Sequence, residues 1–465
     1  MIVTWPPSME TTLALVRCAK AAGFHFGKGT AIVAVQHMLW QTVDLFRAIG
    51  DLGAECQNVF ALGKVFSNTP EVIGTLRHSG VTVADSSKPP PGYFDNYFKR
   101  DVRHFWDVVQ SFLNRRDIKR IIVLDDGGEC IKNTPPELMR RYPMMGVEQT
   151  SQGIAVFEEW PPPYALVSWA RTAVKLHIGG PIFSHYLIAN VRGRFLQGQQ
   201  LHNKQAGIMG LGSMGVAVAK LLLRDGNNVF FYDRDANLSI PPALQWRITR
   251  LGSLEQLMTE CEYVFGCTGR NPFNDAWPMK YRPGIKLISG SSGDQEFGPI
   301  ICDLKQYPSF KIDPVTLDIT CDGPWGPIFI PYHGYPYNFL IHNGEAVPTR
   351  IVQLEIGGLL AGLIQARIHL ALSEKGVENN AGFHRVSPEA QRFVYETWAT
   401  AMGNCGINIK ERFGYDEATL SAARHIQWHV DNSEPNPAAG YRPSSEVENA
   451  MRRIVNAGER VKDMS

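Results

Sequence analysis

Several features are scarce in this chain, and each shortage excludes a class of protein. The eight cysteines form no Cys-x-x-Cys pair and no paired spacing typical of zinc, so we expect buried thiols in a reducing compartment and no metal site. Lys and Arg number 46 against 45 Asp and Glu, and the net charge of +1 gives no reason to expect nucleic acid as a partner. Residues 1–12 lack the basic and then apolar pattern of a secretory signal, and we find no repeats.

Long uncharged apolar runs are also missing. The most apolar long stretch, residues 354–372, contains Glu355, Gln365, Arg367 and His369, which favours a packed helix over a membrane span. With 44% hydrophobic and 20% charged residues, the composition is that of an ordinary globular protein. We therefore predict a cytoplasmic protein with no membrane partner.

The most informative pattern present is Gly-Leu-Gly-Ser-Met-Gly at residues 210–215. An apolar strand (206–209) precedes it, a helix (216–223) follows it, and a second strand (229–232) ends at Asp233. The first glycine makes a tight turn, the second lets the backbone approach a pyrophosphate, and the third lets helix and strand pack closely. This arrangement predicts a bound dinucleotide; the alternative is a glycine-rich turn in another kind of α/β unit.

An acidic residue after the second strand sets the choice of dinucleotide. Asp233 can accept hydrogen bonds from both ribose hydroxyls, which favours NAD and would repel the additional phosphate of NADP. The predicted cofactor residues in this motif are Gly210, Gly212, Ser213, Met214, Gly215 and Asp233.

Strands and helices alternate over most of the chain, which predicts parallel sheets covered by helices. We predict an α/β fold with two doubly wound parallel-sheet domains, the central one a Rossmann NAD-binding domain. The expected organisation is a substrate-binding α/β domain over 1–195, completed by 365–465, and a Rossmann domain over 196–350. A connecting helix (351–372) and a C-terminal helical extension (373–465) follow.

Polar side chains follow two strands of the first domain. Asp125, Asp126 and Glu129 lie at the end of the strand 121–124, where mutual repulsion would shift their pKa values toward an acid–base range. A Ca²⁺ or Mg²⁺ site is an alternative, although the spacing is not that of an EF-hand. His37 is expected to begin a helix directly after the strand 31–35; a single histidine is more often structural than catalytic.

Four segments, residues 35–42, 124–129, 148–153 and 210–215, occur in an order and spacing that resemble S-adenosylhomocysteine hydrolase (adenosylhomocysteinase). That family has a His-Met-Thr-x-Glu-Thr segment, a Leu-Asp-Asp-Gly-Gly-Asp turn, a Glu-Glu-Thr-Thr-Thr-Gly segment and then the NAD fingerprint. The resemblance covers roughly residues 28–350. It implies permanently held NAD that oxidises a ribose 3′-hydroxyl, followed by elimination at the 5′ position and return of the hydride.

The resemblance also assigns roles to residues. It implies catalytic acid–base groups at His37 and Asp126, with His185 in place of a family lysine. It places Gln41, Thr42, Glu129 and Gln149 against the substrate. It places Thr150, Ser151, Asn190, Thr268 and Gly269 against the cofactor. We expect a homo-oligomer with a small-molecule substrate, for which a nucleoside is one candidate.

Departures from the family pattern keep other functions open. Gln149 replaces a glutamate, Ala189 an aspartate and Ser292 a histidine, so later steps of the family reaction lack their partners. We expect an NAD-dependent enzyme that oxidises a nucleoside-like or other small hydroxylated substrate in the interdomain cleft. The alternatives are an NAD-binding pseudoenzyme that senses or scaffolds, and an NAD-dependent dehydrogenase of a different small molecule.

Overall fold

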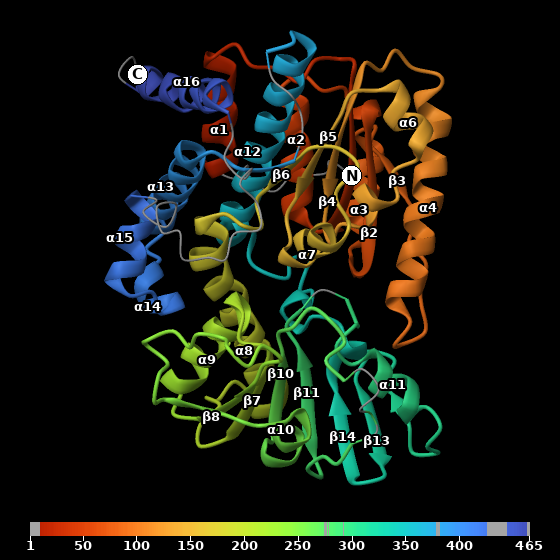
Figure 1. Cartoon of the computed structure of the whole chain (residues 1–465), viewed down its shortest axis with the longest axis vertical. Coiled ribbons are helices and arrows are strands. Elements are labelled where there is room, and N and C mark those ends of the chain that lie inside the picture. The colour runs from red at the N-terminus through yellow and green to blue at the C-terminus, as the bar shows by residue number, and fades with distance from the viewer. Residues whose placement is uncertain are drawn as a thin grey trace. The chain divides into compact units, whose positions relative to one another are not determined.

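The computed structural model describes residues 10–273, 277, 279–291, 293–377, 382–425 and 444–462. The chain divides into two compact units. Unit 1 comprises residues 1–87, 99–179 and 341–465, and unit 2 comprises residues 88–98 and 180–340. The sequence placed the boundaries at 195/196 and 350/351, whereas the structure places them at 179/180 and 340/341 and assigns a short early segment to unit 2 (Figure 1).

Unit 1 is built on a seven-stranded sheet in which every neighbouring pair is parallel. Its order is β15-β6-β5-β4-β1-β2-β3. All nine residues of β1 are buried, because helices cover both faces of a parallel sheet; residues 31–35 are apolar, and the polar Gln36 and His37 follow near the end of the strand. The strands are β1 (Thr30–Met38), β2 (Val59–Asn68), β3 (Thr82–Ala84), β4 (Arg120–Asp125), β5 (Met144–Glu148), β6 (Leu166–Ser168) and β15 (Phe383–Arg385).

Helix α12 (Thr349–Glu374) forms much of the unit 1 core. It packs on β4, β5 and β6 and against other helices of the unit, and Figure 1 shows the strands between α12 and α4. Its glycines allow close contact, since a Cβ at Gly358 would overlap the Trp169 ring. The other helices are α1 (Glu10–Ala21), α2 (Trp40–Asp51), α3 (Pro70–His78), α4 (Phe94–Leu113), α5 (Glu129–Lys132), α6 (Pro136–Arg141), α7 (Ser151–Glu159), α13 (Pro388–Asn404), α14 (Ile409–Phe413), α15 (Glu417–His425) and α16 (Ser445–Lys462), with a 3₁₀ turn η1 (Cys56–Asn58) and a π-helical turn η2 (Lys175–Gly179).

Unit 2 has an eight-stranded sheet of order β12-β13-β14-β11-β10-β7-β8-β9. From β14 to β9 the neighbours are parallel and follow the strand order of a Rossmann fold, and β12, β13 and β14 pair antiparallel at the edge. The strands are β7 (Gln205–Met209), β8 (Asn228–Tyr232), β9 (Ile248–Arg250), β10 (Tyr263–Gly266), β11 (Ile285–Ser289), β12 (Lys311–Ile312), β13 (Ile319–Gly323) and β14 (Gly326–Ile330).

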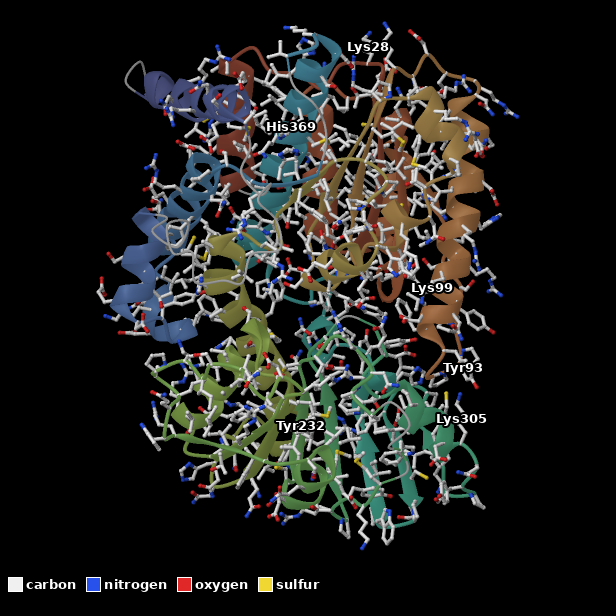
Figure 2. All side chains as sticks on the ribbon, viewed as in Figure 1. Lys28, Tyr93, Lys99, Tyr232, Lys305 and His369 are labelled. Carbon is white, nitrogen blue, oxygen red and sulfur yellow. The ribbon has the colours of Figure 1, made fainter. Side chains whose placement is uncertain are left out.

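The helices of unit 2 cover this sheet. They are α8 (Gly180–Leu196), α9 (Ser213–Arg224), α10 (Leu254–Glu260) and α11 (Gly298–Leu304), with 3₁₀ turns η3 (Pro331–Gly334) and η4 (Tyr337–Phe339). The segment 88–98 joins this unit through α11. The Lys305 ammonium lies 4.5 Å from the centre of the Tyr93 ring, and the two side chains are labelled together in Figure 2.

The predicted fold class is confirmed, because both units have doubly wound parallel sheets and unit 2 is a Rossmann domain. One local prediction is wrong. His37 does not begin a helix: it lies in β1, and α2 starts at Trp40. β1 continues past the apolar run to Met38, with a shift in its register against β2 between Gln36 and Met38.

One described helix, α12, is long and apolar enough by length and composition to cross a membrane. However, 89% of its most apolar window is buried inside the structure, which is typical of a core helix. The predicted packed helix therefore agrees with the burial. The cytoplasmic location stays a prediction.

Candidate functional site

The candidate site of unit 1 lies where parallel strands end. His37 is near the end of β1, Asp126 directly follows β4, and Gln149 directly follows β5. The chain adds β2 and β3 on one side of β1 and then returns to place β4 on the other side. Ligands of open α/β sheets bind at such a switch point, beyond the carboxyl ends of the strands. His37 and Asp126 therefore flank the position at which this fold type places a ligand.

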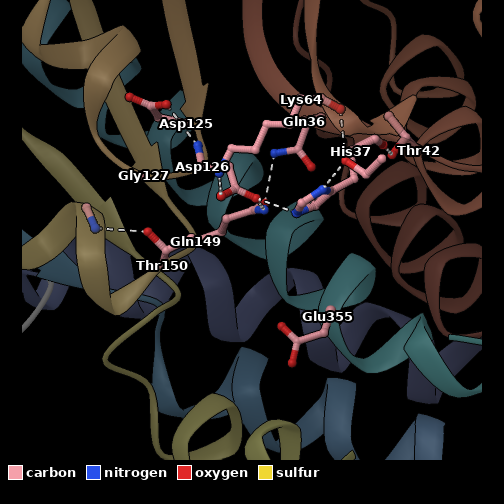
Figure 3. Close-up of polar contacts among 12 residues, drawn as sticks. Gln36, His37, Thr42, Lys64, Asp125, Asp126, Gly127, Gln149, Thr150 and Glu355 are labelled. Atoms are coloured by element: carbon pink, nitrogen blue, oxygen red, sulfur yellow. Dashed lines mark hydrogen bonds and ion pairs between the residues drawn. The ribbon is translucent and has the colours of Figure 1, made fainter. Parts of the chain in front are cut away.

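The Asp126 carboxylate is the centre of a polar cluster (Figure 3). Its Oδ2 lies 3.0 Å from His37 Nε2 and also accepts a hydrogen bond from Gln149 Nε2. Its Oδ1 accepts from the Lys64 ammonium. Gln36 Nε2 donates to Gln149 Oε1 at 2.8 Å and so fixes the orientation of that amide. The Lys64 ammonium and the His37 ring together hold the pKa of Asp126 well below its usual value, so the carboxylate is charged although only 1% is exposed.

His37 is held on both sides of its ring. Nδ1 lies 2.6 Å from Ser67 Oγ, and Nε2 faces Asp126. Burial lowers the pKa of His37 below 6.5, an effect that the charge of Asp126 partly offsets. The ring is therefore neutral at pH 7. A neutral ring that donates from Nε2 to the carboxylate accepts at Nδ1 from the Ser67 hydroxyl.

Two further carboxyl groups lie beneath this cluster. Burial raises the pKa of Asp125 to about 7, although its oxygens accept from the N–H groups of Asp126 and Ile131 at 2.8 Å each. Burial also raises the pKa of Glu148 well above its usual value, and Asp125 adds to the effect. Glu148 Oε1 accepts from Gly127 and Thr150, while its buried Oε2 has no hydrogen-bond partner among the described residues. The site thus contains one carboxyl group whose pKa is lowered, Asp126, beside two whose pKa values are raised, Asp125 and Glu148.

Several residues predicted to contact ligands have local structural contacts in unit 1. Thr42 Oγ1 donates to the His37 carbonyl at 2.5 Å, and the buried Gln41 lies beside it on α2. Thr150 caps α7 by accepting from the Gly153 N–H, and Ser151 is the exposed first residue of that helix. Glu129 accepts from Asn133 at 3.1 Å. Of the predicted substrate residues, Gln149 is the one placed directly on Asp126.

Sequence reasoning missed four residues of this region. Lys64 and Ser67 come from the middle and the end of β2, and a lysine inside an otherwise buried strand was the available signal. Lys175 lies on the π-helical turn η2 and pairs with Glu355 of α12 at 2.7 Å. Glu355 also accepts from the Trp169 indole at 2.7 Å, and its carboxylate is drawn below the cluster in Figure 3. The charge of Lys175 contributes to the lowered pKa of His37.

The glycine-rich loop of unit 2 lies between β7 and α9. Gly210 has a φ of +85°, which only glycine adopts readily, and a Cβ at Gly215 would overlap the Gly210 carbonyl oxygen. A Cβ at Gly212 would meet no described heavy atom within 4 Å. Within the described residues, no side chain caps the N-terminus of α9. An open backbone beside an uncapped helix start fits a pyrophosphate.

The predicted acidic partner faces the same loop. Asp233 Oδ2 accepts from the Leu211 N–H at 2.8 Å, and Oδ1 accepts from the Asp235 N–H at 3.0 Å. The carboxylate is therefore held beside the glycine turn. An adenosine ribose bound there would find its acceptor already oriented.

Of the remaining predicted cofactor residues, Thr150 and Ser151 lie in unit 1, whereas Asn190, Thr268 and Gly269 lie in unit 2. Thr268 and Gly269 follow β10, and their N–H groups donate to the buried Glu296 at 2.5 and 3.3 Å. Asn190 donates to the Tyr337 carbonyl at 2.7 Å, and Met214 accepts from Ser184 Oγ. Ser213 is the first residue of α9. Ser292 lies outside the described residues.

His185, the third predicted catalytic residue, lies on α8 and packs edge-to-face on Tyr186. It belongs to unit 2, whereas His37 and Asp126 belong to unit 1. The structure therefore brings His37 and Asp126 together and does not place His185 in their cluster. Within unit 1, Lys64 pairs directly with Asp126, and the charge of Lys175 also acts on His37.

Comparison with known proteins identifies the nucleotide unit. Residues 185–275 match the family model of the D-isomer specific 2-hydroxyacid dehydrogenase, NAD binding domain. Unit 2 thus carries an NAD-binding domain of this type, and the predicted cofactor, NAD, is confirmed. The matched residues include the whole glycine loop and Asp233.

More distant similarities cover more of the chain. Two uncharacterized proteins from two strains of Mycobacterium tuberculosis are 27% identical over 303 residues, which is 64% of this chain and 57% of each relative. A glyoxylate reductase of Paecilomyces thermophila aligns at 14% identity and a TM-score of 0.33, over 73% of this chain and 95% of that one. A formate dehydrogenase of Granulicella aligns at 12% identity and a TM-score of 0.28, over 40% and 55%. Such low TM-scores carry no structural argument.

The resemblance to adenosylhomocysteinase is a wrong prediction. The family model that matches the glycine motif is that of the 2-hydroxyacid dehydrogenases. A Gly-x-Gly-x-x-Gly turn is common to many dinucleotide-binding domains, so it could not separate the two families. The hydrolase reaction that the resemblance implied is withdrawn with it.

Proposed function

We propose that this protein is an NAD-dependent oxidoreductase that acts on a small hydroxylated substrate. The observation that carries the proposal is the glycine loop and Asp233 within a segment that matches the NAD-binding domain of dehydrogenases. NAD supplies a hydride acceptor when bound. Gly212 and the start of α9 would hold its pyrophosphate, and Asp233 its adenosine ribose.

Oxidation of an alcohol also requires a base for the hydroxyl proton, because the hydride leaves from carbon while the proton leaves from oxygen. We assign this role to His37, which is neutral and 8% exposed, whereas Asp126 and Lys64 are 1% and 3% exposed. Asp126 stabilises the imidazolium that forms, and Lys64 and Gln149 keep the carboxylate in place. A substrate hydroxyl would give its proton to Nδ1, so it would replace the hydrogen bond from Ser67, while Nε2 keeps its bond to Asp126.

The chain Ser67–His37–Asp126 also resembles a hydrolase triad in its order of hydrogen bonds. Ser67 is fully buried, however, and its hydroxyl lies 3.2 Å from the Lys64 carbonyl. A nucleophile must reach the reacting carbonyl, so a hydroxyl in this position supports the histidine rather than attacking a substrate. Proton transfer is the function that this chain of groups fits better.

Charge pairing bears on the class of substrate. Lys64 already pairs with Asp126, and Lys175 with Glu355. Because these two cations are already paired and so do not invite a substrate carboxylate, we propose a neutral alcohol. The name of the matched family, in contrast, refers to 2-hydroxy acids.

The experiment is a panel of 2-hydroxy acids and neutral polyols, offered to the purified protein with NAD while NADH absorbance is followed. We expect NADH from a neutral polyol. Turnover of a 2-hydroxy acid alone would overturn the choice of substrate class. NADH from no member of a broad panel would argue instead for the NAD-binding pseudoenzyme.

A further inference from the structure

Arg250 is the last residue of β9, and its guanidinium reaches the loop that carries Asp233. It donates to three backbone carbonyls: Nη1 to Ala236 at 2.9 Å, and Nη2 to Asp235 at 2.6 Å and to Asp233 at 3.2 Å. The guanidinium also lies 5.7 Å from the centre of the Phe231 ring on β8. One side chain thus contacts both the strand before the loop, at Phe231, and three carbonyls of the loop itself, those of Asp233, Asp235 and Ala236.

The loop needs such a connection because it has few other fixed points. Arg234, Asp235, Ala236 and Asn237 are all exposed. Two Asx turns supply short-range contacts: the Asp233 carboxylate accepts from the Asp235 N–H at 3.0 Å, and the Asp235 carboxylate from the Asn237 N–H at 2.9 Å. Outside the loop, the Leu211 N–H donates to the other Asp233 oxygen at 2.8 Å. The three carbonyls bound by Arg250 belong to the residues on and around these turns. Holding them fixes the direction in which the Asp233 side chain leaves the backbone.

We infer that Arg250 is a positioning residue for cofactor choice: by binding the carbonyls of Asp233, Asp235 and Ala236 it holds the Asp233 carboxylate where the adenosine ribose must bind. The inference rests on the proposed role of Asp233 in preferring NAD to NADP. Arg250 touches neither ribose nor phosphate in this account.

The mechanism of discrimination follows from charge. A fixed carboxylate accepts hydrogen bonds from the two ribose hydroxyls of NAD and repels the 2′-phosphate of NADP. When the loop is free to move, NAD loses an oriented acceptor, while NADP escapes part of the repulsion. Removing Arg250 should therefore weaken NAD binding and leave NADP binding unchanged or improved.

Lysine cannot reproduce the fork of guanidinium donors, because its ammonium is a single point from which three separate carbonyls are hard to reach. Arg250→Lys should therefore give partial rescue. Arg282 provides a matched control in the same unit. It binds the Glu260 carbonyl at 3.2 Å and lies 3.6 Å from the Glu262 carboxylate, and both of these partners lie outside the loop of Asp233.

The test is calorimetric titration of NAD and of NADP into wild type, Arg250→Ala, Arg250→Lys and Arg282→Ala. We expect the ratio of NAD affinity to NADP affinity to fall about tenfold in Arg250→Ala. A change of this size corresponds to the loss of about one to two hydrogen bonds. Arg250→Lys should fall between this value and wild type, and Arg282→Ala should keep the wild-type ratio. Thermal unfolding of each variant separates this effect from loss of fold, and Arg250→Lys remains informative if Arg250→Ala is unstable.

Three results would overturn the inference. A wild-type ratio in both Arg250 variants would show that the loop holds Asp233 without the guanidinium. A fall in NADP affinity larger than that of NAD would show that Arg250 binds phosphate directly. Equal affinity of the wild-type protein for NAD and NADP would instead overturn the role of Asp233 itself, and with it the basis of this inference.

Discussion

A single carboxylate organises the chemistry of unit 1 at the scale of residues. The Asp126 carboxylate accepts hydrogen bonds from His37, Lys64 and Gln149. It stays charged because a cation and an imidazole face it. Its neighbour Asp125 is the last residue of β4, and its pKa is shifted in the opposite direction. Burial without a cationic partner in contact raises the pKa of Asp125 to about 7. Two adjacent residues of one chemical type thus have pKa values shifted in opposite directions.

Asp125 should make stability fall as pH rises. Its pKa is raised in the folded protein, so its stabilising effect is fully present below the ordinary value of about 4 and is lost as pH rises through about 7. We predict that Asp125→Asn flattens the dependence of the unfolding free energy on pH over this window. Urea denaturation at a series of pH values measures it. Asp85→Asn, at a side chain 94% exposed, should keep the wild-type slope; an unchanged slope in Asp125→Asn would contradict the account.

Sequence reasoning identified part of this residue-scale site. His37, Asp126 and Gln149 were predicted and do lie together, because each follows or ends a parallel strand. Lys64 and Ser67 were missed, since they come from β2 and their contact with Asp126 and His37 depends on strand order. Periodicity along the chain gives no strand order. The catalytic role of His185, which lies in unit 2, stays a prediction.

The glycine loop is the clearest case at the scale of elements, because its three glycines have different surroundings. A Cβ at position 215 would overlap a carbonyl oxygen, whereas a Cβ at position 212 would meet open space. The motif therefore contains one glycine required by packing and one left open for a ligand. Sequence alone assigned these roles from the motif, and the structure agrees with them.

Alanine at the two positions should have opposite effects. We predict that Gly215→Ala destabilises unit 2 by about 2 to 3 kcal/mol, because helix and loop must move apart. Gly212→Ala should unfold like wild type and bind NAD at least about tenfold more weakly, since the new methyl group occupies the approach of the pyrophosphate. Denaturation curves and calorimetry separate the two. Wild-type NAD binding in Gly212→Ala would place the pyrophosphate elsewhere.

Most strands were predictable as elements because they are apolar runs bounded by turns, as in β1, β4 and β7. The π-helical turn η2 and the three-residue strand β15 were not. Both are short, and both depend on tertiary contacts: the Tyr415 hydroxyl donates to the Ile178 carbonyl within η2, and β15 pairs with β6. Propensity over a few residues is too weak to reveal such elements.

Two parallel sheets with separate cores define the whole molecule. Each has a switch point next to its first strand, one lined by acid–base groups and the other by the glycine loop. The fold class could be predicted because strand and helix patterns alternate along the chain. The family could not be predicted, because the resemblance rested on four short segments in a plausible order and not on similarity along a whole domain. The predicted homo-oligomer remains a prediction.

NAD should stabilise unit 2 in particular, because the described cofactor residues that carry the proposal lie there. A ligand at one hundred times its dissociation constant adds about 2.7 kcal/mol to the stability of the part that binds it. We predict that NAD raises the midpoint of the thermal transition of unit 2. Differential scanning calorimetry with and without NAD measures the shift, with Gly212→Ala as the control that should show much less. No shift in the wild-type protein would contradict the assignment of the site.

The central claim is that NAD bound by unit 2 and proton transfer by His37 serve one oxidation. The most direct measurement is NADH absorbance for wild type and His37→Ala, each given NAD and the alcohol that the substrate panel identifies. We predict NADH formation by wild type, and a rate at least about one hundredfold lower in His37→Ala, with NAD binding unchanged. A variant that forms NADH at the wild-type rate would contradict the claim.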